Sequence, residues 1–179
     1  MAEQETVARK MESVHQTLMN KAYALWGDNN LTYRNFLTKV LEELGELHFN
    51  AVITGNFNYQ VCNGGFGQWH DNGYSETIEE LVDFFNSLPE NQTIKSVINI
   101  LENVNDELLW VEDGIKESKK MEYDYRDFFK EKLEESFYSH VEYCDRNYYK
   151  INDEVEKILE EYFKTEYNKI STEIREENT

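Results

Sequence analysis

Residues 32–51, TYRNFLTKVLEELGELHFNA, carry the pattern on which the fold interpretation rests. Their apolar side chains recur three and four residues apart, which places them on one face of a helix. The pattern predicts a helix from about residue 32 to residue 54 that ends at Gly55. The apolar face consists of Phe36, Leu37, Val40, Leu41, Leu44, Leu47 and Ala51.

The same helical period continues on both sides of this stretch, and no segment shows the alternating period of a strand. Thr77, with Glu80 three residues later, has the form of a capping box, and we expect a break near Gly114. The other expected helices cover residues 5–26, 77–88, 93 onward, 124–146 and 152 or 153 onward. The sequence therefore predicts an all-α protein, a compact single-domain bundle of six to seven helices over residues 1–179. Within it, residues 1–30 form an N-terminal helix and turn, and residues 170–179 form a frayed tail.

Residues 56–74, NFNYQVCNGGFGQWHDNGY, interrupt the helical pattern with glycine and asparagine around aromatic side chains. We interpret them as an ordered loop, with room for one short helical turn at residues 66–70. In this interpretation the aromatic side chains anchor the loop in the core, and the amides hydrogen-bond the backbone. The expected architectural residues are Asn63, Gly64, Gly65, Phe66, Gln68, Trp69 and Asn72.

The composition is strongly acidic, with 36 Asp and Glu against 18 Lys and Arg and a formal net charge of −18. Such a chain is repelled by nucleic acids and by anionic membranes, so we expect neither as a direct partner. There is no apolar signal-peptide region at the N-terminus and no run long enough to span a membrane. Cys62 and Cys144 form no CxxC motif, which favours a reduced, cytoplasmic location.

The negative charge is concentrated in residues 40–115, which contain fourteen carboxylates and a single basic residue, Lys95. Helical spacing arranges part of it in two rows that advance about 5.4 Å per turn, compared with about 3.4 Å between phosphates of one DNA strand. These rows predict a surface that imitates DNA and binds a basic DNA-binding protein. Its expected residues are Glu76, Glu79, Glu80, Asp83, Glu90, Glu102, Asp106, Glu107, Glu112 and Asp113.

The alternative interpretation is that charged faces serve only solubility, and it fits the C-terminal half well. Acids there precede bases by four residues, the favourable orientation for pairs along a helix. The expected pairs are Glu122–Arg126, Glu142–Arg146, Asp153–Lys157 and Glu160–Lys164. For residues 40–115 the scarcity of bases leaves both interpretations open.

The segment 61–72, VCNGGFGQWHDN, resembles the signature of the bacterial DNA-mimic protein family, in which Asn-Gly-Gly-Phe is followed by Gln, an aromatic residue and Asn. Glu42 and Glu43 on the preceding helix, and residues 134–138 and 160–163, are also similar to that family. The resemblance covers about residues 35–165. It implies an all-helical fold, a homodimer and occupation of the DNA-binding surface of a transcription factor.

An enzyme is the third and least favoured interpretation, with His70 and Asp71 beside Gln68 as its candidate acid–base residues. The four histidines form neither an HExxH nor a Glu-x-x-His motif, so we expect no metal, no cofactor and no catalysis. The preferred prediction is an inhibitor that blocks a transcriptional regulator, a nucleoid protein or a nuclease of a defence system. The second is an immunity-type or interaction protein that neutralises one basic partner without imitating DNA.

Overall fold

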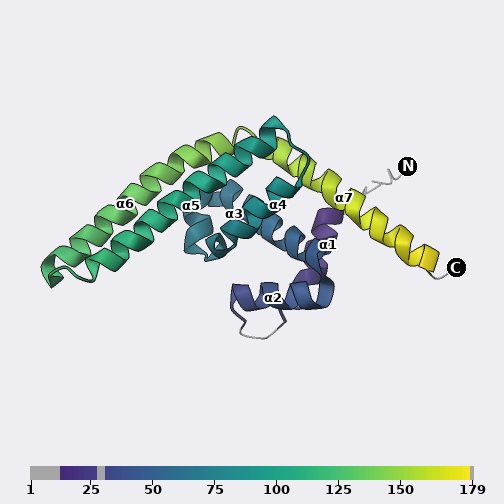
Figure 1. The fold of residues 1–179 in the computed structure, drawn as a ribbon, viewed down its shortest axis with the longest axis horizontal. Helices are drawn as coiled ribbons and strands as arrows, with labels where there is room; N and C mark the ends of the chain where they lie inside the picture. Colours follow the sequence, from purple (N-terminus) through teal and green to yellow (C-terminus); the bar gives the residue numbers. More distant parts are fainter. Residues whose placement is uncertain (1–12, 28–30, 178–179) are drawn as a thin grey trace, which may run out of the picture.

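The computed structural model describes residues 13–27 and 31–177, and these residues form seven α-helices and one short 3-10 helix, η1, with no strand among them (Figure 1). The predicted all-α fold is therefore confirmed. The N-terminal part of the expected first helix, residues 5–12, lies outside the described residues. The elements are α1 (Val14–Tyr23), α2 (Tyr33–Leu44), α3 (Glu46–Asp71), η1 (Tyr74–Thr77), α4 (Ile78–Ser87), α5 (Gln92–Ser118), α6 (Tyr123–Tyr148) and α7 (Asn152–Glu177).

Helix α3 lies at the centre of the fold, with α1, α2, α4, α6 and α7 packed against it. Seven consecutive residues, 51–57, are buried, so this part of α3 is enclosed on all sides rather than along one stripe. Phe57 packs edge-on against Trp69, Phe85 and Tyr148, which come from three different helices. The largest buried side chains thus meet around α3.

The predicted loop over residues 56–74 is wrong, because α3 continues through residue 71. Two tyrosines hold Asn56: the Tyr23 hydroxyl donates to Asn56 Oδ1, and Asn56 Nδ2 donates to the Tyr33 hydroxyl at 2.9 Å. Gly55 does not end a helix either, because it lies inside α3. A Cβ at this position would collide with the Met19 side chain of α1, so the glycine allows α1 to pack closely on α3. These polar and small residues serve contacts between helices, and the contacts override their weak helix propensity.

Other boundaries also differ from the predicted ones. Gly45, with φ 80°, divides the expected helix at residues 32–54 into α2 and α3. The Thr77 hydroxyl donates to the Tyr74 carbonyl inside η1 and makes no capping bond. Helix α5 begins at Gln92, one residue before the expected position, and Asn91 caps it, because its side chain accepts from the Ile94 N–H at 2.9 Å.

The C-terminal half is more regular than the sequence suggested. Helix α5 passes through Gly114, where a Cβ would lie 2.7 Å from Leu133 Cδ1 of α6. The glycine therefore allows close packing of α5 on α6 instead of breaking a helix. Helix α7 continues to Glu177 through most of the segment that was expected to fray, and residues 178–179 lie outside the described part.

Helices α5 and α6 form a long antiparallel hairpin that extends away from the other helices (Figure 1). Its free end is the turn at residues 119–122, between α5 and α6. In the described residues no helix is both long and apolar enough to cross a bilayer. The fold thus presents two distinct regions, the body around α3 and the projecting hairpin.

Candidate functional site

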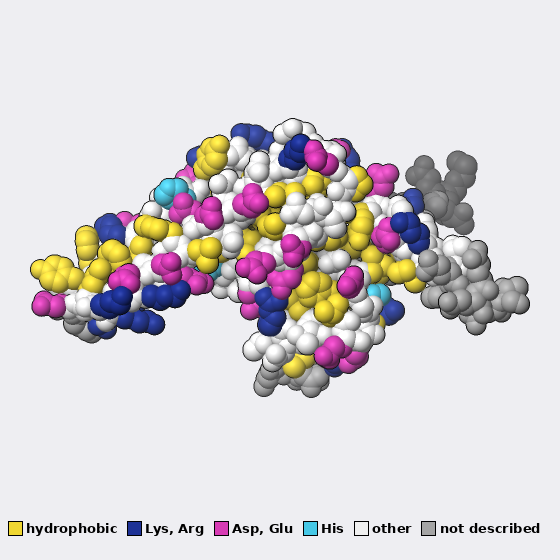
Figure 2. All heavy atoms as spheres, in the orientation of Figure 1, with side chains coloured by type: hydrophobic (Ala, Val, Ile, Leu, Met, Phe, Trp, Pro, Cys, Tyr) yellow, Lys and Arg dark blue, Asp and Glu magenta, His cyan; other side chains and the backbone are white. Residues whose placement is uncertain are grey.

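The acidic residues predicted to bind a partner lie on η1, on α4, on the α4–α5 turn and on α5. Eight of the ten are exposed, and Glu80 and Glu107 are half-buried. On the face shown in Figure 2, Asp and Glu side chains gather over α4 and the middle of α5, whereas Lys and Arg side chains gather near the free end of the hairpin. Helices α4 and α5 pack against each other, so the two predicted acidic rows belong to neighbouring helices.

A basic side chain from outside the acidic stretch partly neutralises it. Arg34 of α2 forms an ion pair with Glu80 and also donates to the Glu76 carbonyl oxygen. These contacts raise the pKa of Arg34, with the Glu80 hydrogen bond as the largest cause. No local sequence pattern indicates this pair, because Arg34 precedes Glu80 by 46 residues.

Four further acids of the predicted surface also have basic neighbours. Glu90 pairs with Lys95, and Glu107 lies 3.6 Å from His140. Lys116 pairs with Asp113 at 3.0 Å and with Glu112 at 4.0 Å. The acids that have no ion pair in the described part of the chain are Glu76, Glu79, Asp83, Glu102 and Asp106.

These five carboxylates, which we call the unpaired acidic face, are all exposed. Carboxylates without a partner repel one another at helical spacing and weaken α4 and α5 by a few tenths of a kcal/mol per pair. Arg34 attracts Glu76, and Glu79 in the first turn of α4 interacts favourably with the helix dipole, so the repulsion is offset only in part. The unpaired acidic face is therefore suited to a cationic surface supplied by another molecule.

The acidic residues of the C-terminal half form contacts with the rest of the protein beyond the expected ion pairs. The pair of Glu142 with Arg146 is confirmed at 2.9 Å, but Lys157 pairs with Glu154 rather than with Asp153. Glu160 accepts from the Val14 N–H at 3.1 Å and so helps to cap α1. Among the described residues, the expected pairs Glu122–Arg126 and Glu160–Lys164 do not form.

The Asn-Gly-Gly-Phe element forms a kink in α3. Gly65 has φ 77° and ψ −177°, a conformation that is open essentially to glycine alone. The kink directs the Phe66 N–H toward α6, where Asp145 Oδ1 accepts from it at 2.7 Å. Phe66 and Trp69, which follow the kink, are fully buried.

Asp145 therefore acts as a cap for the second half of α3, although it lies 79 residues further along the chain. Burial raises the pKa of Asp145, and the Phe66 N–H opposes this shift because it stabilises the charged carboxylate. A Cβ at Gly65 would lie 2.7 Å from both Cγ and Oδ1 of Asp145. The glycine thus has two functions here, since it provides the backbone conformation and makes room for the carboxylate.

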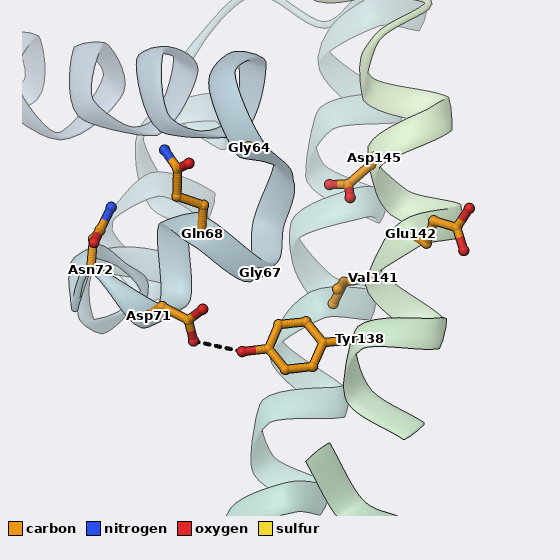
Figure 3. A pocket seen from close by; sticks show the side chains of 9 residues that line it. All are labelled: Gly64, Gly67, Gln68, Asp71, Asn72, Tyr138, Val141, Glu142 and Asp145. Carbon is orange, nitrogen blue, oxygen red and sulfur yellow. Dashed lines mark hydrogen bonds between the residues drawn. The ribbon is translucent and has the colours of Figure 1, made fainter. Parts of the chain in front are cut away.

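The kink borders an open cleft between α3 and α6, lined by the residues drawn in Figure 3. The Tyr138 hydroxyl crosses this cleft and donates to Asp71 Oδ1 at 2.7 Å. This hydrogen bond raises the pKa of Tyr138 to about 12. Asp71, Glu142 and Asp145 all accept hydrogen bonds from within the protein, so the cleft belongs to the packing of α3 on α6.

The amides of the motif only partly follow the predicted backbone contacts. Asn63 Nδ2 donates to the Tyr59 carbonyl at 2.7 Å, as expected. Gln68 and Asn72 instead donate to the side chain of Gln60, at 2.8 and 2.9 Å. Two residues outside the motif, Gln60 and Asp145, therefore complete its hydrogen bonds. Neither was among the residues expected from the sequence.

We expect Asp145→Ala to lower the free energy of unfolding by about 1–3 kcal/mol, because the buried Phe66 N–H loses its acceptor. Asp145→Asn retains a carbonyl oxygen at that position and should cost clearly less. Urea denaturation followed by circular dichroism measures both. Equal losses in the two variants would show that the acceptor oxygen is not what Asp145 contributes.

The candidate catalytic residues are directed to separate structural partners. His70 Nδ1 lies 2.8 Å from Ser75 Oγ, and its ring packs edge-on against Phe137, whereas Asp71 is bound by Tyr138. His70 and Asp71 are therefore not oriented toward a common substrate position. In the described residues, no three His, Cys, Asp or Glu side chains are grouped so that they could hold a metal ion.

Comparison with known proteins places the chain in a family. Residues 42–166, from the end of α2 into α7, match the family described as "DMP19-like protein". The chain belongs to the DMP19-like family. DMP19 denotes DNA mimic protein 19, and the DMP19-like family is not a known enzyme family. The match includes η1, α4, α5 and α6 and leaves α1 outside.

No curated protein and no solved structure matches this DMP19-like chain. The unpaired acidic face and both sides of the α3 kink all lie within the matched range. The match with the DMP19-like family therefore extends over both the unpaired acidic face and the kinked helix α3.

Proposed function

We propose that this protein binds a DNA-binding protein through the unpaired acidic face and blocks the access of that protein to DNA. The observation that carries the proposal is that Glu76, Glu79, Asp83, Glu102 and Asp106 are exposed and have no ion pair in the described structure. Membership in the DMP19-like family supports the same function. The candidate partners are a transcriptional regulator, a nucleoid protein or a defence-system nuclease.

The physical basis is the substitution of carboxylates for phosphates. A DNA-binding surface gains affinity from Lys and Arg side chains that neutralise phosphates and release counterions. Carboxylates held on two packed helices offer the same charge without base edges, so they engage the part of binding that does not depend on sequence. Such a protein should compete with DNA and should itself have no affinity for nucleic acid.

The test is capture from a lysate of the source cells on the immobilised protein, followed by elution with rising salt or with duplex DNA. We expect DNA-binding proteins to be released by both, since screening shortens the Debye length from about 10 Å at 0.1 M to about 3 Å at 1 M salt. A captured partner that remains bound in saturating duplex DNA would contradict mimicry. One such partner that also withstands high salt would support the immunity-type alternative instead.

We also propose that the protein acts as a homodimer. Large apolar side chains are exposed on several helices, among them Trp110, Tyr125, Phe128 and Tyr143. Aromatic residues are enriched in protein interfaces, where they bury a large area. Light scattering at micromolar concentration should give the mass of two chains.

A further inference from the structure

The free end of the α5–α6 hairpin exposes a group of large apolar side chains. Tyr125 and Phe128 of α6 are 67% and 60% exposed. With Met121 and Phe129, which are half-buried, and with the exposed Glu122 at its edge, they line a shallow and mostly apolar groove. The hairpin extends away from the body, and no other described helix covers this end (Figure 1). We call the four apolar residues the hairpin patch.

The charge around the hairpin patch differs from that of the rest of the protein. Residues 114–132 contain six Lys and Arg and five Asp and Glu, although the whole chain carries a net charge of −18. Lys120 pairs with Glu117 at 2.6 Å, and Lys132 Nζ lies 5.6 Å from the centre of the Phe128 ring. The end of the hairpin is thus both apolar and close to neutral.

We infer that the hairpin patches of two copies pack against each other and form the interface of the homodimer. This inference rests on the proposed homodimer and adds the surface that makes it. Two chains of charge −18 repel each other wherever their acidic faces meet. The hairpin end combines exposed apolar area with balanced charge, so a second copy can approach there at the lowest electrostatic cost.

A second copy fits the hairpin patch better than the basic partner does. A Lys- and Arg-rich surface is attracted to the unpaired acidic face on α4 and α5 and gains little at an end whose positive and negative charges balance. Contact between the same patches on both copies gives a closed pair, whereas a hairpin end bound to an acidic face would generate open chains. The dimer therefore uses one end of the molecule and leaves both acidic faces available.

The salt dependence of dimerisation distinguishes this interface from the partner-binding face. Salt screens the repulsion between the two acidic bodies and also strengthens effective apolar burial when the anion is sulfate. The dimer should therefore be as tight or tighter in sodium sulfate than at low salt. The affinity of the unpaired acidic face for its basic partner should instead fall as salt rises.

The decisive variant is the double substitution Tyr125→Glu/Phe128→Glu, studied by sedimentation or light scattering across a concentration series. Two carboxylates placed at each patch should weaken dimerisation at least about 100-fold. The matched control is Tyr59→Glu/Tyr167→Glu, which adds the same charge at exposed tyrosines of α3 and α7 and should leave the dimer intact. Circular dichroism verifies that both variants remain folded.

Each result decides a different point. A wild-type protein that is monomeric at micromolar concentration would overturn both the homodimer and its interface. A dimer that persists in the hairpin variant, or that the control variant also disrupts, would overturn the interface alone. A wild-type dimer that dissociates as salt rises would also overturn it, and this measurement needs no variant. Displacement by DNA is measured separately, so failure of the interface is distinguishable from failure of mimicry.

Discussion

Gly65→Ala is expected to lower the free energy of unfolding by about 3 kcal/mol. With φ 77° and ψ −177°, Gly65 has a backbone conformation that an L-residue adopts only under strain. The added Cβ would also press on the Asp145 carboxylate that caps the second half of α3. Urea denaturation of the purified protein measures the loss.

The neighbouring glycine provides the control. Gly64 is exposed and has no positive φ, and a Cβ there would meet the side chain of Gln68, whose Cδ and Cβ would lie 2.5 and 2.9 Å away. Gly64→Ala should therefore cost clearly less than Gly65→Ala, because the backbone at Gly64 has no positive φ, the end of the Gln68 side chain can move and alanine favours a helix. Similar losses from the two substitutions would mean that the kink is not the constraint described above.

The triple reversal Glu79→Lys/Asp83→Lys/Asp106→Lys should weaken binding of a captured DNA-binding protein about 100-fold at 0.1 M salt. The difference from the wild type should shrink at 1 M salt, where screening weakens both. The three side chains are exposed and have no ion pair in the described residues, so the fold should be retained. Surface plasmon resonance measures the affinity, and circular dichroism verifies the fold.

The control for this variant has to be chosen from the structure. Glu156 and Glu160 accept hydrogen bonds from Asn58 and from the Val14 N–H, so reversing them would disturb the packing of α7. The triple reversal at Glu134, Asp153 and Glu161 makes the same change in net charge on exposed residues of α6 and α7. Equal affinity losses from the two triple variants would move the binding surface away from α4 and α5.

Helical periodicity predicted most of the fold, because most helices here bury one face. The pattern of Ile94, Val97 and Leu101 is that of a helix with one apolar stripe, and all three are buried. The same method failed for α3, where residues 51–57 are all buried and show no stripe, and where the kink at Gly65 interrupts the helical period. Asn56 and Gly55 indicated a loop, whereas in the structure they serve contacts with Tyr23 and Met19 of α1.

The sequence predicted that the candidate site is acidic, but it did not predict which residues of the protein contact the acidic side chains and the kinked helix. The exposed acids of α4 and α5 follow directly from composition and spacing. Arg34 and Asp145, which decide how far the acidic surface is neutralised and how the α3 kink is held, lie 46 and 79 residues from their partners. Nothing in the local sequence marks either residue, because both act only once distant helices have packed together.

The cap on α3 also sets the order in which the chain can fold. The bonds that hold the kinked helix reach across 79 residues to Asp145, 67 to Tyr138 and 90 to Tyr148. Closing such long loops costs entropy before any contact is gained, and distant contacts of this kind slow folding. During synthesis, residues 66–71 have left the ribosome long before α6 is complete. The element that defines the centre of the protein therefore reaches its final form only after most of the chain has been made.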